Sequence, residues 1–487
     1  MDKNLKALNP ALVWKHFAEI CNIPHPSHSE DKIRQYLVDF AVAQGLDYKV
    51  DEAGNVYMSK PATPGMEDRK VIVLQAHMDM VPQKNNDKVF DFINDPIEAY
   101  IDGEWVTANG TTLGADNGIG VAAILAILED DTVEHGPIEG LITATEETGM
   151  DGAFGLQEGL LKGDILLNLD SETEGELYVG CAGGTDVNAT LSYTAEPAEA
   201  EGYKAFEIAV KGCKGGHSGI QIVCQRANAN KLLFRLLRKL SAKMEVKLAS
   251  VDGGGLRNAI PREAVAVVLV KAADAQALVA EVEAFEQLAI NEYAAVEDAI
   301  SVKAAECAAP EKVISPETAK LLMAAMVACP DGVDKMSLAM EGLVQTSNNM
   351  ARVVSDGATV KVQCLVRSSV RSEKEALSDS IKAVLEMAGF SVELSGSYDG
   401  WNPNMDSPIL KAMLSSYETL YGKCPSVTAI HAGLECGIIG GKYPNLDMIS
   451  FGPTICYPHS PDEKVEIASV EKFYDFLLNT LKNAPKK

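Results

Sequence analysis

Apolar positions in the first sixty residues follow two different periods. Between residues 11 and 21, and again between 30 and 44, they return at helical spacing, which predicts two amphipathic helices. Ser27 and Glu30 match the capping-box pattern ahead of the second helix. The segment 48–59 carries turn residues at its centre and is typical of a β-hairpin.

Further along, apolar residues form continuous runs. Val71–Leu74, Leu141–Thr145 and Asp164–Leu169 have the pattern of strands buried on both faces, and Val121–Leu128 that of a buried helix. Strands that alternate with helices predict an α/β fold with a mostly parallel sheet. Ligands of such sheets bind beyond the carboxyl ends of the strands.

The pattern changes in the middle of the chain. Residues 186–397 hold long Ala- and Glu-rich stretches of helical character, such as 274–298, separated by strand-like runs, such as 264–271. The α/β pattern then returns. We therefore predict a main α/β domain built from 1–185 and 398–487, with an inserted α+β domain over 186–397.

Charge and composition exclude several function classes. The 69 acidic residues outnumber the 43 basic ones, for a net charge of −26. Such a chain is not expected to bind nucleic acid or an anionic membrane. No apolar run approaches the roughly 20 residues of a membrane span, and no apolar leader follows Met1. We expect a cytoplasmic protein.

Acidic and histidine residues follow the predicted strands. His77 and Asp79 come after the first strand, Glu146 and Glu147 after the second, and Asp170 after the third. A two-metal hydrolytic site needs nitrogen and oxygen ligands, a bridging carboxylate and a base. Taken singly, most of these residues fit an ordinary strand-end or turn residue equally well. Their shared position at strand ends favours a metal site.

Two further residues complete the set. Asp116 lies among glycines just before the buried helix, where it would serve equally as a helix cap, and His459 lies in a proline-rich loop. The overlapping sequence Gly118–Ala123 matches the G-x-G-x-x-A nucleotide fingerprint. No strong strand leads into it, so it gives only weak support to a nucleotide-dependent oxidoreductase.

The motifs around these residues resemble those of a known family. Those motifs are His77–Val81, Leu113–Asn117, Thr145–Gly149, Asn168–Glu172 and Pro458–Ser460. Together they resemble the aminoacylase/carboxypeptidase G family of di-zinc metallopeptidases, and within it the dipeptidase branch. The resemblance implies these roles: one zinc ion on His77 and Asp170, a second on Glu147 and His459, Asp116 as the bridge, Glu146 as general base and Asp79 as the residue that orients His77. It also implies a cis peptide bond between Asp116 and Asn117.

The inserted domain corresponds in this family to a lid, often used for dimer contacts, so a homodimer is expected. The resemblance gives His217 the role of polarising the scissile carbonyl and places Asn258 against the substrate. Arg367 would pair with the substrate carboxylate, with Arg371 as the alternative. Glu435 would receive the substrate's free amine. From the residues alone, each of these has an equally ordinary structural interpretation.

The implied activity is a metallo-dipeptidase that hydrolyses unblocked dipeptides, including carnosine-like Xaa-His peptides, through a metal-bridged water with Glu146 as general base. Its cofactors would be two divalent metal ions, expected to be zinc, with cobalt or manganese as alternatives. An N-acyl amino-acid deacylase on the same fold is the closest alternative. A metal-bearing binding protein without catalysis is less favoured, because the base Glu146 is present.

Overall fold

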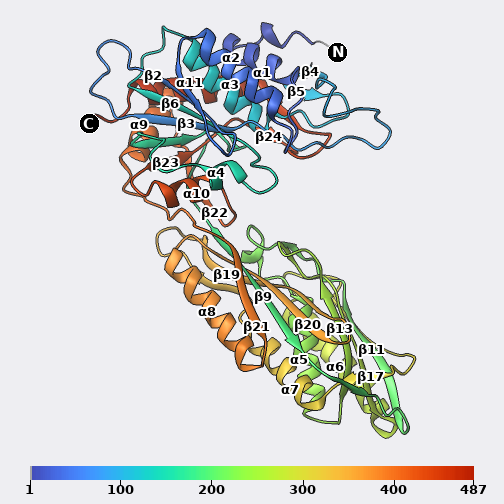
Figure 1. The fold of residues 1–487 in the computed structure, drawn as a ribbon. Coiled ribbons are helices and arrows are strands. Elements are labelled where there is room, and N and C mark those ends of the chain that lie inside the picture. The colour runs from blue at the N-terminus through green and yellow to red at the C-terminus, as the bar shows by residue number, and fades with distance from the viewer. Residues whose placement is uncertain (1–2) are drawn as a thin grey trace. The chain divides into compact units, whose positions relative to one another are not determined.

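The computed structural model describes residues 3–487, which divide into two compact units (Figure 1). Unit 1 comprises the chain up to Cys181, together with Trp401–Ala429 and Leu434–Lys487. Unit 2 comprises Ala182–Gly400 and the short segment Ile430–Gly433. The boundaries predicted from the sequence, after residues 185 and 397, stay predictions. The segment 430–433 was not part of the predicted insertion.

Unit 1 contains both ends of the chain (Figure 1). Its elements are η1 (Leu5–Ala7), α1 (Ala11–Cys21), α2 (Asp31–Ala43), β1 (Asp47–Val50), β2 (Val56–Lys60), β3 (Ile72–His77), β4 (Ala99–Asp102), β5 (Trp105–Ala108), α3 (Ala115–Glu129), β6 (Ile138–Thr143), α4 (Asp151–Gly155), β7 (Ile165–Asn168), β8 (Glu176–Cys181), α9 (Pro408–Tyr421), β22 (Ser426–Ile430), α10 (Glu435–Lys442), β23 (Asp447–Ser450), β24 (Ile455–Cys456), β25 (Lys464–Glu466) and α11 (Ile467–Lys482).

The main sheet of unit 1 has the order β1-β2-β6-β3-β7-β23-β8-β22. Its four central strands β6, β3, β7 and β23 run parallel, and the hairpin β1–β2 joins them antiparallel to β6. Every residue of β3, β6 and β7 is buried. This confirms an α/β fold whose parallel strands were recognisable as continuous apolar runs, because helices cover both faces of the sheet.

Helix α3 lies on the sheet beside α1 and α2 (Figure 1), and it is buried from Ala115 to Leu128. Gly118 and Gly120, which belong to the nucleotide-like fingerprint, are packing positions. A β-carbon on Gly120 would lie 2.7 Å from the Leu169 carbonyl oxygen, and one on Gly118 would lie 3.1 Å from the Phe17 ring. The glycines therefore let the helix approach its neighbours, and no phosphate-binding loop forms there.

The capping box predicted at the start of α2 is wrong. The helix begins at Asp31, and the preceding Glu30 makes no side-chain cap bond to it. Glu30 Oε1 instead accepts from Thr145 Oγ1 at 2.7 Å, and Ser27 Oγ donates to Asp79 Oδ2 at 2.8 Å. Tertiary partners that follow β3 and β6 thus bind both side chains, and the one local bond of Glu30 is to the His28 N–H at 2.9 Å.

Unit 2 is an antiparallel α+β unit. Its elements are β9 (Gly183–Ser192), β10 (Ala195–Pro197), β11 (Tyr203–Lys211), β12 (Gly216–His217), η2 (Ile222–Cys224), α5 (Ala229–Ser241), β13 (Lys247–Gly254), β14 (Ala259–Ile260), β15 (Ala264–Lys271), η3 (Ala272–Asp274), α6 (Ala275–Glu292), β16 (Ser301–Glu306), β17 (Lys312–Ile314), α7 (Pro316–Ala328), β18 (Gly332–Met336), β19 (Val344–Ser355), β20 (Thr359–Ser368), α8 (Arg371–Met387) and β21 (Ser391–Tyr398). Its large sheet has the order β16-β11-β15-β13-β19-β20-β9-β21, with β18 paired to β19.

Helices α5 to α8 share one apolar core with the inward side chains of this large sheet. The amphipathic helix α5 contributes Leu232, Phe234 and Leu237, which are fully buried. Among the described residues of both units, no helix combines the length and the apolar character that crossing a bilayer requires.

Candidate metal centre

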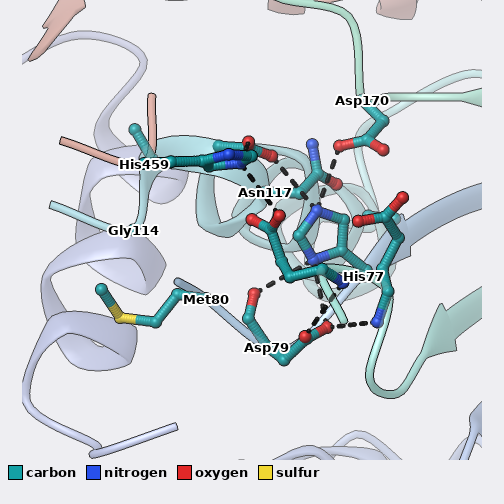
Figure 2. Close-up of polar contacts among 12 residues, drawn as sticks. His77, Asp79, Met80, Gly114, Asn117, Asp170 and His459 are labelled. Carbon is teal, nitrogen blue, oxygen red and sulfur yellow. Dashed lines mark hydrogen bonds and ion pairs between the residues drawn. The ribbon is translucent and has the colours of Figure 1, made fainter. Parts of the chain in front are cut away.

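Three neighbouring parallel strands deliver the predicted ligands to one edge of the main sheet. His77 is the last residue of β3, Glu146 and Glu147 follow β6, and Asp170 follows β7. The carboxyl ends of parallel strands meet at the same edge, so these side chains converge although their residues are far apart in sequence. Figure 2 shows the His77 ring between Asp79 and Asp170.

Asp116 stands between two groups of potential ligands. Its Oδ1 lies 3.1 Å from His77 Nε2, which in turn lies 3.3 Å from Asp170 Oδ1. Its Oδ2 lies 3.2 Å from His459 Nε2, which lies 2.9 Å from Glu147 Oε2. The chain thus forms two triads that share Asp116, with the ligand atoms of each triad within 4.8 Å of one another. This is the arrangement that a bridging carboxylate requires.

Local backbone structure presents Asp116 to both triads. It is the second residue of α3 but has non-helical backbone angles. The peptide bond between Asp116 and Asn117 is cis, which confirms the cis bond expected from the family resemblance. Asn117 Nδ2 donates to the Leu169 carbonyl at 2.7 Å and so ties the start of α3 to the end of β7. Gly114 just before the helix has φ 73° and faces Met80 (Figure 2), where a β-carbon would lie 3.0 Å from the Met80 sulfur.

Asp79 connects the histidine to the acid pair. The Nδ1 of His77 lies 3.0 Å from the Asp79 carbonyl oxygen and 3.3 Å from Asp79 Oδ1. The carboxylate of Asp79 also accepts from the backbone N–H groups of Glu146 and Glu147, at 2.9 and 3.3 Å. Burial opposes ionisation of Asp79, but hydrogen bonds from His77, the Glu146 N–H and Ser27 hold its pKa at about 2. The ionised carboxylate can therefore orient both sides of the centre.

The charges of the cluster are unbalanced without a cation. Burial raises the pKa of Asp170 to about 6, and it raises the pKa values of Glu146 and Glu147 as well. Burial would lower the pKa of His77, yet the neighbouring carboxylates raise it well above its usual range. Burial likewise opposes ionisation of Asp116, whose pKa the two histidines nevertheless lower.

The donor set of this cluster fits divalent metal ions. Among the described residues, the buried Oε1 of Glu147 has no hydrogen-bond partner, although buried polar atoms almost always have one, and Asp170 Oδ1 has only its ion pair with His77. Imidazole nitrogens and carboxylate oxygens are the ligands that zinc takes in catalytic sites. Cations bound here would balance the carboxylates and use the oxygens that the described residues leave without a hydrogen bond.

Glu435 lies within unit 1 near this cluster. It is the first residue of α10 and is 1% exposed. Its Oε2 accepts from Gln75 Nε2 at 2.6 Å and Thr143 Oγ1 at 2.8 Å, while Oε1 has no hydrogen-bond partner. Burial raises its pKa to about 7, and the charge of His77 opposes that rise.

The other predicted substrate residues lie in unit 2. Arg367 is 6% exposed, its Nε has no hydrogen-bond partner, and none of the ion pairs in the described part of the chain includes it. His217 Nδ1 accepts from the N–H groups of Gly219 and Ile220, both at 3.1 Å, so the neutral ring carries its proton on Nε2. Asn258 is exposed in a turn, and Arg371 is bound to Glu375 and Asp399 at the surface.

Sequence reasoning missed His431, which lies in the segment 430–433 of unit 2. Its Nε2 lies 2.8 Å from Ser347 Oγ, and burial together with the positive charge of Arg367 lowers its pKa to about 3. The ring is therefore neutral at physiological pH. The signal was available, because His431 opens the same glycine-containing motif that drew attention to Glu435.

Comparison with known proteins agrees with this geometry. Residues 73–483 match the family described as peptidase family M20/M25/M40. The chain is 45% identical over 483 residues to the cytosol non-specific dipeptidase of Escherichia coli K12, with 99% of each protein covered. Its fold matches the crystal structure of aminoacylhistidine dipeptidase from Vibrio alginolyticus with a TM-score of 0.96 and 48% identity, covering 99% of both chains. Aminopeptidase PepT of Bacillus cereus, at 16% identity, shares the fold with a TM-score of 0.59 over 98% of this chain and 99% of that one. The chain therefore belongs to peptidase family M20/M25/M40.

Proposed function

We propose that this chain is a metallo-dipeptidase that hydrolyses unblocked dipeptides, including Xaa-His peptides, at a centre of two divalent metal ions. The observation that carries the proposal is Asp116, with one oxygen directed at each triad of ligands. The two full-length relatives described above are named as dipeptidases, which supports the same substrate class. They do not favour the N-acyl amino-acid deacylase.

In this proposal one ion would be held by His77 and Asp170. The second ion would be held by Glu147 and His459, and Asp116 would be a ligand of both ions. Bound divalent ions act as Lewis acids and make water a nucleophile at neutral pH. Glu146 takes the proton of the attacking water and delivers it to the leaving amine. Its backbone N–H is fixed by Asp79 Oδ1, and its burial raises the pKa of its carboxyl well above the usual range. Asp79 fixes the plane of the His77 ring.

Recognition of the peptide falls in part to unit 2. We assign the substrate's terminal carboxylate to Arg367, because its guanidinium is buried and forms no ion pair with a carboxylate of residues 3–487. We assign His217 to the scissile carbonyl. Its Nδ1 accepts from two backbone N–H groups, so the proton on Nε2 can be donated to the carbonyl oxygen. Glu435 Oε1 is the acceptor we assign to the free amine, and Asn258 a further substrate contact.

Replacing Arg367 with alanine is expected to lower kcat/KM for Ala-His by about 100-fold, because the carboxylate loses its charged partner. Cleavage of the same dipeptide with an amidated C-terminus should be unchanged, since the amide has no charge to lose. Arg371→Ala is the matched control, and its exposed, ion-paired side chain should leave both rates within about twofold. Steady-state kinetics on both substrates decides between the two arginines. An equal loss on acid and amide would contradict the assignment.

Zinc suits the mixture of two imidazoles and three carboxylates, with cobalt and manganese as alternatives of the same ligand preference.

The Escherichia coli relative is described as cytosolic, and we extend that location to this chain. The homodimer expected from the sequence stays a prediction.

Hydrolysis of Ala-His, β-Ala-His and N-acetyl-alanine before and after chelation tests the proposed function. We expect cleavage of the unblocked dipeptides, loss of that cleavage after chelator treatment, and recovery on addition of Zn²⁺. Absence of dipeptide cleavage by the zinc-loaded protein would overturn the proposal. Cleavage of N-acetyl-alanine alone would establish the deacylase instead.

A further inference from the structure

One buried carboxylate outside the proposed ligand set binds four successive backbone N–H groups. Glu463 immediately precedes β25 and is 2% exposed. Its Oε2 accepts from the N–H groups of Leu113 and Gly114, at 2.7 and 3.1 Å. Its Oε1 accepts from those of Ala115 and Asp116, at 2.8 and 3.3 Å. One carboxyl group thus holds the whole turn that leads into Asp116.

Glu463 is also connected to the loop of His459, four residues earlier in the chain. Its backbone N–H donates to the Ser460 carbonyl at 3.0 Å, and its own carbonyl accepts from Thr107 Oγ1 at 2.7 Å. Strand β25 then pairs with β24 and β5, which fixes this end of the loop in a sheet. The position of the Glu463 backbone is therefore set independently of its carboxylate.

We propose that Glu463 is a positioning residue of the metal centre, which fixes Asp116 and His459 relative to each other so that Asp116 can serve both triads. The proposal rests on the proposed metal site. Because the carboxylate holds the 113–116 turn and its backbone belongs to the His459 loop, one side chain joins two ligands that lie 343 positions apart. Both oxygens of Glu463 bind backbone N–H groups and neither binds the side chain of a proposed ligand. Glu463 would therefore position the ligands through the backbone.

A plain helix cap would explain less. Helix α3 begins at Ala115, so a cap alone would need only the N–H groups within the first turn. Glu463 also binds the N–H groups of Leu113 and Gly114, which precede the helix, and Gly114 has a left-handed φ of 73° and packs on Met80. The carboxylate therefore sets the conformation of the ligand-bearing turn as well as the helix end.

Glu463→Gln tests the proposal in the full-length protein, because an amide NH₂ would face N–H donors and the charge would be lost. We expect Zn²⁺ affinity, measured by competition with a chelator, to fall about 10–100-fold, as for other residues that orient metal ligands. Loss of kcat with little change in KM should accompany it. Glu139→Gln is the matched control. Glu139 is 4% exposed and accepts from the N–H groups of Lys162 and Gly163, which belong to no ligand loop.

Glu139→Gln removes the charge of an equally buried carboxyl but should keep the wild-type Zn²⁺ affinity within about twofold. Glu463→Asp keeps the carboxyl group on a shorter side chain and should retain part of the Zn²⁺ affinity. If circular dichroism shows that the glutamine variant does not fold, the aspartate variant provides the measurement. Wild-type Zn²⁺ affinity in both folded Glu463 variants would overturn the proposal. The wild-type titration is run in parallel, so a protein that binds no Zn²⁺ would refute the proposed function separately.

Discussion

Glu146→Gln should reduce kcat for dipeptide hydrolysis by about 10²–10⁴-fold while the protein keeps its full metal content. Glutamine has nearly the shape of glutamate but cannot accept the proton of the attacking water, and general-base catalysis contributes a factor of this size. The geometry supports a role in proton transfer. The backbone of Glu146 is fixed by Asp79, and burial raises the pKa of its carboxyl well above the usual range.

Metal analysis of the purified variant and steady-state kinetics on Ala-His give the two quantities needed. Glu158→Gln, an exposed acid of the same unit, serves as control and should match the wild type in both. Near-normal kcat in a zinc-loaded Glu146→Gln protein would remove the residue from the reaction. Loss of zinc together with activity would make it a ligand, a role its closeness to His77 and Glu147 also allows.

Asp170→Asn should have opposite effects on the metal-free and the metal-bound protein. In the metal-free protein, Asp170 is a buried carboxyl whose pKa burial raises from 3.8 to about 6, against the opposing effect of its ion pair with His77. A group whose pKa is higher in the folded state costs stability as pH rises from the unfolded pKa to the folded one. For this shift the cost at neutral pH is about 3 kcal/mol. Asparagine imitates the protonated form and avoids that cost.

Denaturant unfolding of the chelator-treated proteins between pH 4 and pH 8 measures this effect. The variant and the wild type should agree near pH 4, and the advantage of the variant should grow between pH 4 and about 6 and level off above that. With Zn²⁺ added, the order should reverse, because metal binding stabilises only a protein that retains the ligand. A variant less stable than the metal-free wild type at pH 7 would show that Asp170 is satisfied without a cation.

The main sheet and the proposed ligands were predictable because their signals are local. A continuous apolar run such as Ile72–Leu74 indicates a strand buried on both faces, and a parallel sheet then brings the residues after each strand to one edge. His77, Glu147 and Asp170 could be grouped on that basis alone. The assignment of Asp116 and His459 needed the family resemblance, since a glycine-flanked acid and a loop histidine have ordinary explanations.

What sequence could not predict are contacts whose partners are set by tertiary structure. Ser27 and Glu30 have the spacing of a capping box, yet both side chains bind residues near the acid pair, because those acceptors and donors compete with the helix end. Glu463 follows His459 by four residues but contacts the turn at 113–116, and no periodicity reports that. His431 was overlooked because its partner Ser347 lies on β19, far away in sequence.

The division of the chain has a consequence for anyone who wishes to build a smaller enzyme from it. Cys181 and Trp401 exchange backbone hydrogen bonds of 2.9 Å in both directions, so a short turn could close the gap left by deleting unit 2. That excision would leave the segment 430–433 behind, since it is anchored in unit 2 through Ala182 and Ser347. A minimal unit 1 therefore needs a redesigned link between β22 and α10 as well. Unit 2 is built from two separate segments of the chain, so a single deletion cannot remove it.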